Sequence, residues 1–379
     1  MNRAERLIRR ASEATSLSDL GEESFREGLA QLVASADAEA RFNERGREAF
    51  DARIVALLSQ RLAVEHCYAR HPEIDEQQIV APLIGLGLPR TGSTALACLL
   101  AEDPNVRSIR TWEALSPCPP PEAASIDADP RIAQAQAAME SRARLFPRMT
   151  AMLPSTATSP TECQMFMGYD FKSQVFEAFA HIPTYSAWLW HRADLVPTYR
   201  YVKRVLKLLQ WHCPPRRWRL KNPSHSLFIG ALSRVFPDAR YCMTHRDVAA
   251  VIPSVADVYL ELSKAYCDDV DRKALGRLAA DFCELGMRRM IAFRDAGNDD
   301  RFFDIHFAPF QRDPFPILAA LYDFLGEELT PLARARMEAW RRSTPRNESY
   351  QRTDMAEFGL DAAGLRQRFR FYSDRFDVQ

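Results

Sequence analysis

The sequence predicts an α/β fold in which a central parallel sheet is flanked by helices. An apolar run of strand length (residues 80–86) leads through a Gly/Pro turn into an apolar helix. A second pattern, strand–helix–strand over residues 217–244, indicates parallel strands joined by a right-handed crossover. The chain has 379 residues, 47% of them hydrophobic, which is enough for a large α/β domain with a sizeable core.

Composition narrows the classes of function. Lys plus Arg and Asp plus Glu are equal at 50 each, so no global field attracts nucleic acid or an anionic membrane. We find no secretory h-region and no apolar run of the about 20 residues that cross a bilayer. The eight cysteines lack CxxC pairs, which favours reduced thiols over zinc or disulfides. We therefore expect a cytoplasmic protein without a transmembrane segment or a nucleic-acid partner.

Residues 1–78 predict a helical N-terminal extension packed on the core. Apolar side chains recur at a spacing of three to four residues, as at Phe25, Leu29 and Leu32. The alternative interpretation is an arm through which the chain forms a homo-oligomer. The α/β domain is expected over residues 79–379.

The turn after the first strand has the features of a phosphate site. A helix N-terminus offers free backbone N–H groups and partial positive charge. Glycines let the main chain approach an anion, and a guanidinium and hydroxyls add donors: here Gly87, Arg90, Thr91, Gly92, Ser93 and Thr94. The Gly-Lys-Ser/Thr ending of a Walker A loop is missing, which disfavours NTP hydrolysis. The alternative is an ordinary turn between a strand and a helix.

A mostly helical segment, residues 113–212, follows and is predicted to form an insertion. We expect this insertion to contain a pocket for an acceptor substrate. Residues 146–190 are rich in Met and aromatic side chains, which line apolar pockets but also fill cores. Glu162 lies within this stretch. A carboxylate among apolar neighbours is a stronger base than a solvated one.

The next strand and crossover place further polar residues at strand ends. The strand at 217–220 leads into Lys221 and His225, a helix is expected over 227–235, and a second strand over 239–244 ends before Arg246. Functional side chains collect at the carboxyl ends of parallel strands. Ser254 follows Arg246 by eight positions, so both can converge on one phosphate.

The remaining chain alternates helices with one more strand. A helical pattern covers 255–294, a strand is expected at 301–307, and a helix at 315–325. The tail shows helical runs over 330–342, 344–357 and 361–376.

Two motifs together resemble the cofactor signatures of the PAPS-dependent sulfotransferases, where PAPS is 3′-phosphoadenosine 5′-phosphosulfate. They are GLPRTGST around Arg90 and THRDVAAVIPS at 244–254. The chain is similar to a bacterial branch of this family, which carries further short elements; here these are Trp112-Glu113, Leu220-Lys221-Asn222-Pro223-Ser224-His225 and Phe358-Gly359-Leu360. The resemblance implies a three-layer fold like that of P-loop nucleotide kinases.

The resemblance also implies roles for individual residues. The residues from Arg90 to Thr94 would cradle the 5′-phosphosulfate, and Arg246 with Ser254 would hold the 3′-phosphate. Val248 stands where the family usually has proline, which should alter the turn without removing a ligand. Arg90 occupies the region of a lysine in the cytosolic branch, and it can neutralise charge but cannot donate a proton.

The expected chemistry is in-line transfer of a sulfonate to a hydroxyl or amine, without a metal. Lys221 is expected at the bridging oxygen between phosphate and sulfonate. Glu162 and His225 are the two candidates for the general base. The acceptor is expected to be a small apolar or aromatic molecule. The alternatives are a P-loop kinase or NTPase, and a nucleotide-binding protein without catalysis.

Overall fold

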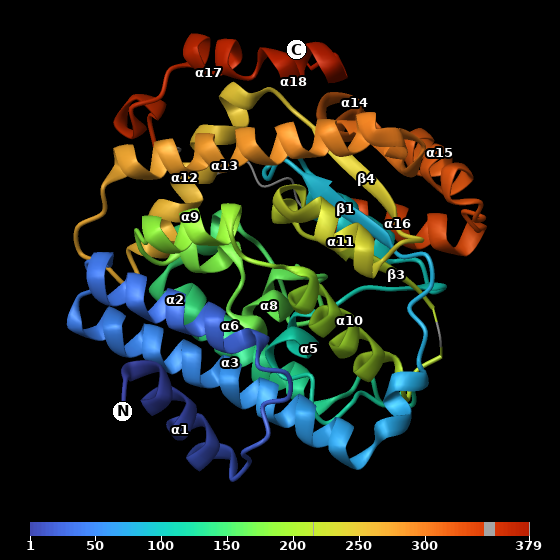
Figure 1. The fold of residues 1–379 in the computed structure, drawn as a ribbon. Coiled ribbons are helices and arrows are strands. Elements are labelled where there is room, and N and C mark those ends of the chain that lie inside the picture. Colours follow the sequence, from blue (N-terminus) through green and yellow to red (C-terminus); the bar gives the residue numbers. More distant parts are fainter. Residues whose placement is uncertain (215, 345–352, 379) are drawn as a thin grey trace.

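The computed structural model describes residues 1–214, 216–344 and 353–378 (Figure 1). Five strands form an all-parallel sheet in the order β2-β3-β1-β4-β5. The strands are β1 (Leu83–Gly87), β2 (Val106–Arg107), β3 (Arg217–Lys221), β4 (Arg240–His245) and β5 (Phe302–His306). Helices cover both faces, so the predicted three-layer α/β architecture is confirmed.

Side chains that alternate along the strands divide the interior into two cores. Ile84 of β1 and Met243 of β4 face the larger core, whereas Leu83 and Cys242 face the smaller one. The smaller core is closed by α4 (Ser93–Ala101), α15 (Phe315–Leu325) and α16 (Pro331–Ser343). Both faces of the sheet are therefore buried, as is usual for parallel sheets.

The N-terminal helices form a layer on the larger core, drawn in blue in Figure 1. They are α1 (Arg3–Thr15), α2 (Ser24–Glu39) and α3 (Glu44–Arg70). Phe25 and Phe50 are fully buried in that core. The buried guanidinium of Arg61 donates from Nε to the Leu20 carbonyl at 2.7 Å and from Nη2 to the Glu22 carbonyl at 2.8 Å. These bonds tie α3 to the connection that precedes α2.

A run of mostly short helices connects β2 to β3. They are α5 (Thr111–Leu115), α6 (Pro130–Leu145), α7 (Pro147–Met152), α8 (Gln164–Met167), α9 (Pro183–His191) and α10 (Val196–Gln210). After β3, the crossover consists of the 3-10 helix η4 (Pro223–Phe228) and α11 (Ile229–Val235). No helix in the described ranges combines the length and the apolar character needed to span a membrane.

The C-terminal part wraps around the top of the sheet in Figure 1. Its helices are α12 (Val248–Ser263), α13 (Arg272–Phe293), α14 (Phe307–Arg312), η7 (Met355–Phe358), α17 (Ala362–Arg368) and α18 (Arg370–Phe376), besides α15 and α16. Of the helical run expected over 344–357, residues 345–352 lie outside the described residues.

Three boundaries differ from the sequence prediction. β1 begins at Leu83 rather than at residue 80, since Ala81 has a positive φ of 40° and Pro82 follows it. The two-residue strand β2 was not expected, because such a short edge strand has no periodicity to read. The helical pattern over 255–294 is broken between α12 and α13, where Asp271 caps the new helix by accepting from the Ala274 amide at 2.9 Å.

Candidate active site

The loop between β1 and α4 is shaped by three residues with positive φ. Gly87 has φ 111°, Arg90 has φ 62° and Gly92 has φ 88°. A Cβ at Gly87 would approach Cγ of Met243 to 3.0 Å, so glycine permits the close packing against β4. Gly92 is the N-cap of α4 and provides no side-chain cap. The first amides of α4 are therefore not used by an N-cap side chain, and a helix N-terminus of this kind is suited to an anion.

Three contacts join this loop to the second motif. Thr91 Oγ1 and Thr244 Oγ1 lie 2.5 Å apart. The Nε of Arg90 donates to Ser254 Oγ at 3.1 Å, and Nη1 of Arg246 donates to the Arg90 carbonyl at 3.0 Å. Register explains the meeting, because Gly87 of β1 lies opposite Thr244 of β4. Residues about 160 positions apart in the sequence thus form one cationic, hydroxyl-rich cluster.

The guanidinium of Arg246 is oriented by an aromatic ring as well as by the loop. Its Cζ lies 4.1 Å from the ring centroid of Phe307, at the start of α14. Phe307 also contacts the loop between β1 and α4, since a Cβ at Gly92 would lie 3.2 Å from its ring. Arginine stacks well on aromatic faces, and the stacking limits its side-chain freedom.

Lys221 and Glu162 form an ion pair beside the N-terminal end of α4. Lys221 Nζ donates to Glu162 Oε1 at 2.9 Å and to Thr94 Oγ1 at 3.2 Å. Gln164 Nε2 also donates to the Glu162 carboxylate. The Cys163 amide donates to the Lys221 carbonyl at 3.0 Å, which fixes the segment around Glu162 to the end of β3.

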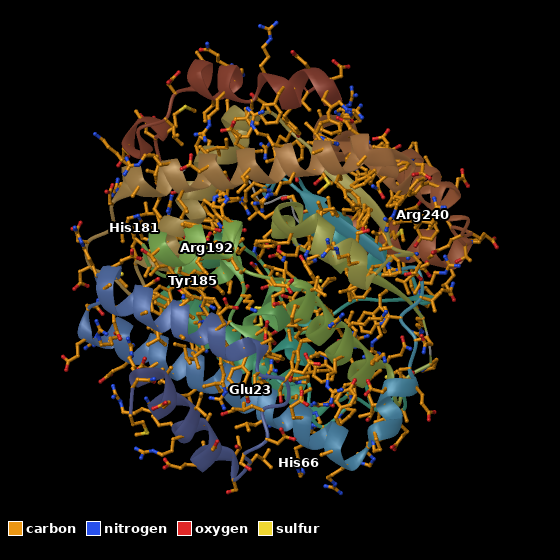
Figure 2. The ribbon with its side chains drawn as sticks, in the orientation of Figure 1. Glu23, His66, His181, Tyr185, Arg192 and Arg240 are labelled. Atoms are coloured by element: carbon orange, nitrogen blue, oxygen red, sulfur yellow. The ribbon has the colours of Figure 1, made fainter. Side chains whose placement is uncertain are left out.

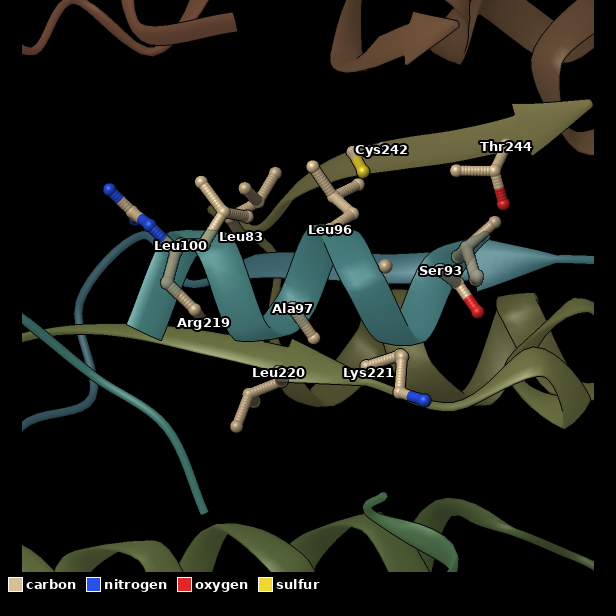
Figure 3. A pocket seen from close by; sticks show the side chains of 12 residues that line it. Leu83, Ser93, Leu96, Ala97, Leu100, Arg219, Leu220, Lys221, Cys242 and Thr244 are labelled. Carbon is tan, nitrogen blue, oxygen red and sulfur yellow. The ribbon is translucent and has the colours of Figure 1, made fainter. Parts of the chain in front are cut away.

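Figure 3 shows Lys221 together with other side chains around α4. Ser93, Lys221 and Thr244 lie at the same end of the helix, and the polar tips of Ser93 and Lys221 point toward that end. The other side chains in that view are mostly apolar and line a narrow cavity of about 20 Å³ between α4 and the sheet. That cavity has room for about one water molecule and is too small for a nucleotide.

The surroundings of Glu162 differ from the expected apolar pocket. Its side chain is 24% exposed, and its partners are the ammonium of Lys221 and the amide of Gln164. The Met and aromatic residues around it mostly turn inward instead. Met152, Phe166, Met167 and Tyr185 are among those that are buried. Figure 2 shows Tyr185 within the helical layer, where its hydroxyl donates to the Phe171 carbonyl at 2.8 Å.

His225 lies in the core of the crossover. It is 1% exposed, and Nδ1 lies 2.8 Å from the Tyr199 hydroxyl. Nε2 has no hydrogen-bond partner among the described residues. Burial lowers the pKa of His225 to about 3, because the imidazolium would lose its hydration.

The predicted site residues therefore form one cluster, except for His225, which lies apart from it. The loop residues, Arg246, Ser254, Lys221 and Glu162 converge at the carboxyl ends of β1, β3 and β4, whereas His225 points into the core. Sequence reasoning missed Thr244 and Gln164, which contact Thr91 and Glu162. Thr244 directly precedes His245-Arg246 at a strand end, which is a signal that could have identified it.

Comparison with known proteins identifies the family. A profile described as the sulfotransferase family matches residues 82–331. The chain belongs to the sulfotransferase family. It is similar to the crystal structure of sulfotransferase STF9 from Mycobacterium avium, at 32% identity and a TM-score of 0.93 over 100% of this chain and 98% of that one. It is also similar to sulfotransferase STF1 from Mycobacterium tuberculosis H37Rv, at 28% identity and a TM-score of 0.87 over 96% of this chain and 97% of that one.

A search of curated protein sequences finds no significant match. The family assignment nevertheless makes the chain an enzyme and favours sulfonate transfer over the kinase and binding-protein alternatives. Within the described ranges, this sulfotransferase has no group of three or more His, Cys, Asp or Glu side chains that could hold a metal ion.

Proposed function

We propose that this sulfotransferase uses PAPS as its donor and transfers the sulfonate to a hydroxyl or amine of a small apolar or aromatic molecule. One observation carries the donor assignment. Ser254 receives a hydrogen bond from Arg90 at 3.1 Å, and Arg246 binds the Arg90 carbonyl at 3.0 Å. A second anion-binding cluster thus adjoins the uncapped end of α4, as expected for a ligand with two separate phosphate groups.

The hydrogen-bonding groups of these residues suit PAPS. The amides at the start of α4, together with the hydroxyls of Ser93 and Thr94, would hold the 5′-phosphosulfate. The guanidinium of Arg246 and the hydroxyl of Ser254 would hold the 3′-phosphate, which ATP lacks. Arg90 lies between the two groups and would serve both.

When bound, the donor supplies a sulfonate on a phosphate leaving group. The chain has to orient an acceptor oxygen or nitrogen, stabilise charge and remove a proton. Lys221 Nζ is 3.2 Å from Thr94 Oγ1 at the mouth of the phosphate loop, which suits a cation that stabilises the leaving oxygen. Arg90 adds permanent charge without any proton to give.

Glu162 is the general base that the geometry favours. Its carboxylate lies 2.9 Å from Lys221 Nζ and is partly open to solvent, so a bound acceptor could reach it. His225 is less suitable, because it is sealed in the core and its pKa of about 3 makes it a weak base. We assign His225 a packing role beside Tyr199, whose hydroxyl lies 2.8 Å from Nδ1.

Two side chains near Glu162 support the proposed acceptor class, although the direct partners of its carboxylate are Lys221 and Gln164. Met165 is half-buried three positions beyond it. Burial is the main cause that raises the pKa of the Tyr259 hydroxyl on α12. The negative charge of Glu162 raises it further, which indicates that the two side chains are near each other. An adaptable thioether and an aromatic ring near the base suit an apolar or aromatic acceptor.

A transfer assay with sulfur-labelled PAPS and a panel of phenols, alcohols and amines tests the function. We expect labelled product, and we expect Glu162→Gln to lower turnover about 100-fold or more while it keeps the affinity for adenosine 3′,5′-bisphosphate. Glu328→Gln, at an exposed position, is the matched control and should retain full turnover. His225→Ala distinguishes the two bases.

Two results would contradict the proposal. Loss of turnover in His225→Ala with intact fold and cofactor affinity, together with an active Glu162→Gln enzyme, would reverse the base assignment. Mg²⁺-dependent ATP turnover without any transfer from PAPS would overturn the donor itself.

A further inference from the structure

The last two helices of the chain lie against the loop that carries Arg246. α17 and α18 are drawn in red at the top of Figure 1, above α13. They fall beyond residue 331, where the match to the sulfotransferase family profile ends. Their contacts with His245, Arg246 and Asp247 give them a specific relation to the proposed 3′-phosphate site.

The first contact is a two-point ion pair on Asp247. Arg366 of α17 donates from Nη2 to Asp247 Oδ2 at 2.7 Å and from Nε to Oδ1 at 3.3 Å. Asp247 is also the N-cap of α12, because its Oδ1 accepts from the Ala249 amide at 3.1 Å. Burial raises the pKa of Asp247, but these hydrogen bonds outweigh burial and the net pKa lies below its usual range. One carboxylate thus fixes α17, the loop and α12, which carries Ser254.

The second contact is a directed chain of hydrogen bonds through Tyr372 of α18. Asp304 is a carboxylate that also binds Arg294 at 2.8 Å, so His245 Nε2 must be the donor at 2.8 Å. Nδ1 of the neutral ring then accepts from the Tyr372 hydroxyl, which lies 3.1 Å away. Burial is the larger effect on this hydroxyl and raises the net pKa of Tyr372, whereas the Arg246 backbone amide, which lies near it, lowers the pKa in part.

His245 and Tyr372 in this chain are shielded from solvent, whereas the Asp304 side chain is 32% exposed. Tyr372 is fully buried and His245 is 1% exposed. Burial lowers the pKa of His245, which keeps the ring neutral and its Nδ1 free to accept. The end of β4, which leads directly into Arg246, is therefore fixed by a hydroxyl of α18.

We propose that α17 and α18 form a clamp that positions Arg246 for the 3′-phosphate, with Tyr372 and Arg366 as its positioning residues. The inference rests on the proposed use of PAPS and deepens it. Arg246 would be held at the preceding residue, His245, by Tyr372, at the next residue by Arg366, and at its guanidinium by Phe307 and the Arg90 carbonyl. A guanidinium that is already oriented loses less freedom when it binds a phosphate.

Calorimetry with two nucleotides tests the clamp. Adenosine 3′,5′-bisphosphate carries the 3′-phosphate, and AMP does not. We compare the unsubstituted enzyme with Arg366→Ala and Tyr372→Phe. Arg370→Ala is the matched control, because Arg370 of α18 makes only an exposed pair with Asp374 in the described structure. Thermal unfolding of each variant shows whether the fold is intact.

We expect both clamp variants to bind adenosine 3′,5′-bisphosphate about 5- to 10-fold more weakly, while their affinity for AMP changes less than about 2-fold. The Arg366 pair is largely exposed, with the arginine side chain 60% exposed, so its removal should leave the melting temperature nearly unchanged. Arg370→Ala should bind both nucleotides like the unsubstituted enzyme. Arg366→Lys keeps the charge but loses the two-point contact, and should be intermediate.

Two results would overturn the clamp. One is an affinity for the bisphosphate within about 2-fold of the unsubstituted enzyme in the folded Arg366→Ala variant. The other is an equal loss for both nucleotides, which would show a general loosening of the site. If the unsubstituted enzyme itself binds the two nucleotides equally, the donor proposal falls and the clamp falls with it.

Discussion

Arg90 combines a permanent positive charge with an unfavourable backbone conformation. Its φ of 62° lies in the left-handed region, which costs a non-glycine residue about 1–2 kcal/mol. The side chain holds Ser254 and the Met152 carbonyl, and the main-chain carbonyl holds Arg246. Strain at this position is thus tied to contacts that shape the proposed cofactor site.

Two substitutions separate strain from charge at position 90. Arg90→Gly should be more stable than Arg90→Ala by about 1 kcal/mol, because glycine adopts positive φ freely and alanine does not. Both variants should lose about 10-fold or more in affinity for adenosine 3′,5′-bisphosphate. Urea unfolding measures the first effect and calorimetry the second. Equal stability of the two variants would argue against backbone strain at Arg90.

At the scale of elements, the break between α12 and α13 depends on a single cap. The Asp271 carboxylate accepts from the Ala274 amide at 2.9 Å, and this backbone hydrogen bond lowers the pKa of Asp271 below its ordinary value. The stabilisation is therefore present above the unfolded-state pKa and is lost as the pH falls through the folded-state value.

Removal of this cap has an expected size and pH dependence. Asp271→Ala should lower the free energy of unfolding by about 1 kcal/mol at pH 7, and by less at pH 3. Chemical denaturation at the two pH values measures the difference. A loss of equal size at both pH values would show that the effect does not come from the charged cap.

The elements that the sequence predicted well are those with strong local patterns. β3, β4 and α15 follow the expected ranges closely, because apolar runs bounded by Pro, Gly or charged residues mark them. β2 and the break before Asp271 were missed, since a two-residue strand and a side-chain cap inside a helical pattern leave little periodic signal.

The candidate site was likewise predicted only in part from the sequence. The two motifs led to Arg90, Arg246 and Ser254, and the sheet register brings these residues together. The contacts of Tyr372 with the Arg246 loop depend on how the last helix packs, which no local pattern encodes. His225 was expected at a strand end near the chemistry, but the crossover turns it into the core.

At the scale of the whole molecule, a carboxyl in the helical layer makes stability depend on pH. Glu177 is 1% exposed, and burial raises its pKa from 4.5 to about 8. The side chains of Ser186, Gln174 and Trp190 oppose this shift only in part. The folded state therefore binds a proton that the unfolded state releases between pH 4.5 and about 8.

Glu177 makes the folded state less stable as the pH rises. The contribution of Glu177 to stability is complete below its unfolded pKa and is lost as the pH rises through about 8. Glu177→Gln mimics the protonated acid, so it should raise the melting temperature by about 2–6 °C at pH 8.5 and by much less at pH 5. Calorimetric melting at both values measures this. A benefit that does not grow with pH would contradict the buried protonated acid.

The fold brings loops from both motifs to one edge of the sheet, where we propose that two phosphate groups of one nucleotide are bound at once. The most direct measurement is the dissociation constant of the unsubstituted enzyme for adenosine 3′,5′-bisphosphate compared with that for AMP. We predict that the bisphosphate binds about 10- to 100-fold more tightly, and that Arg246→Ala removes most of this preference. Equal affinity for the two nucleotides, or a preference that persists in Arg246→Ala, would contradict the account.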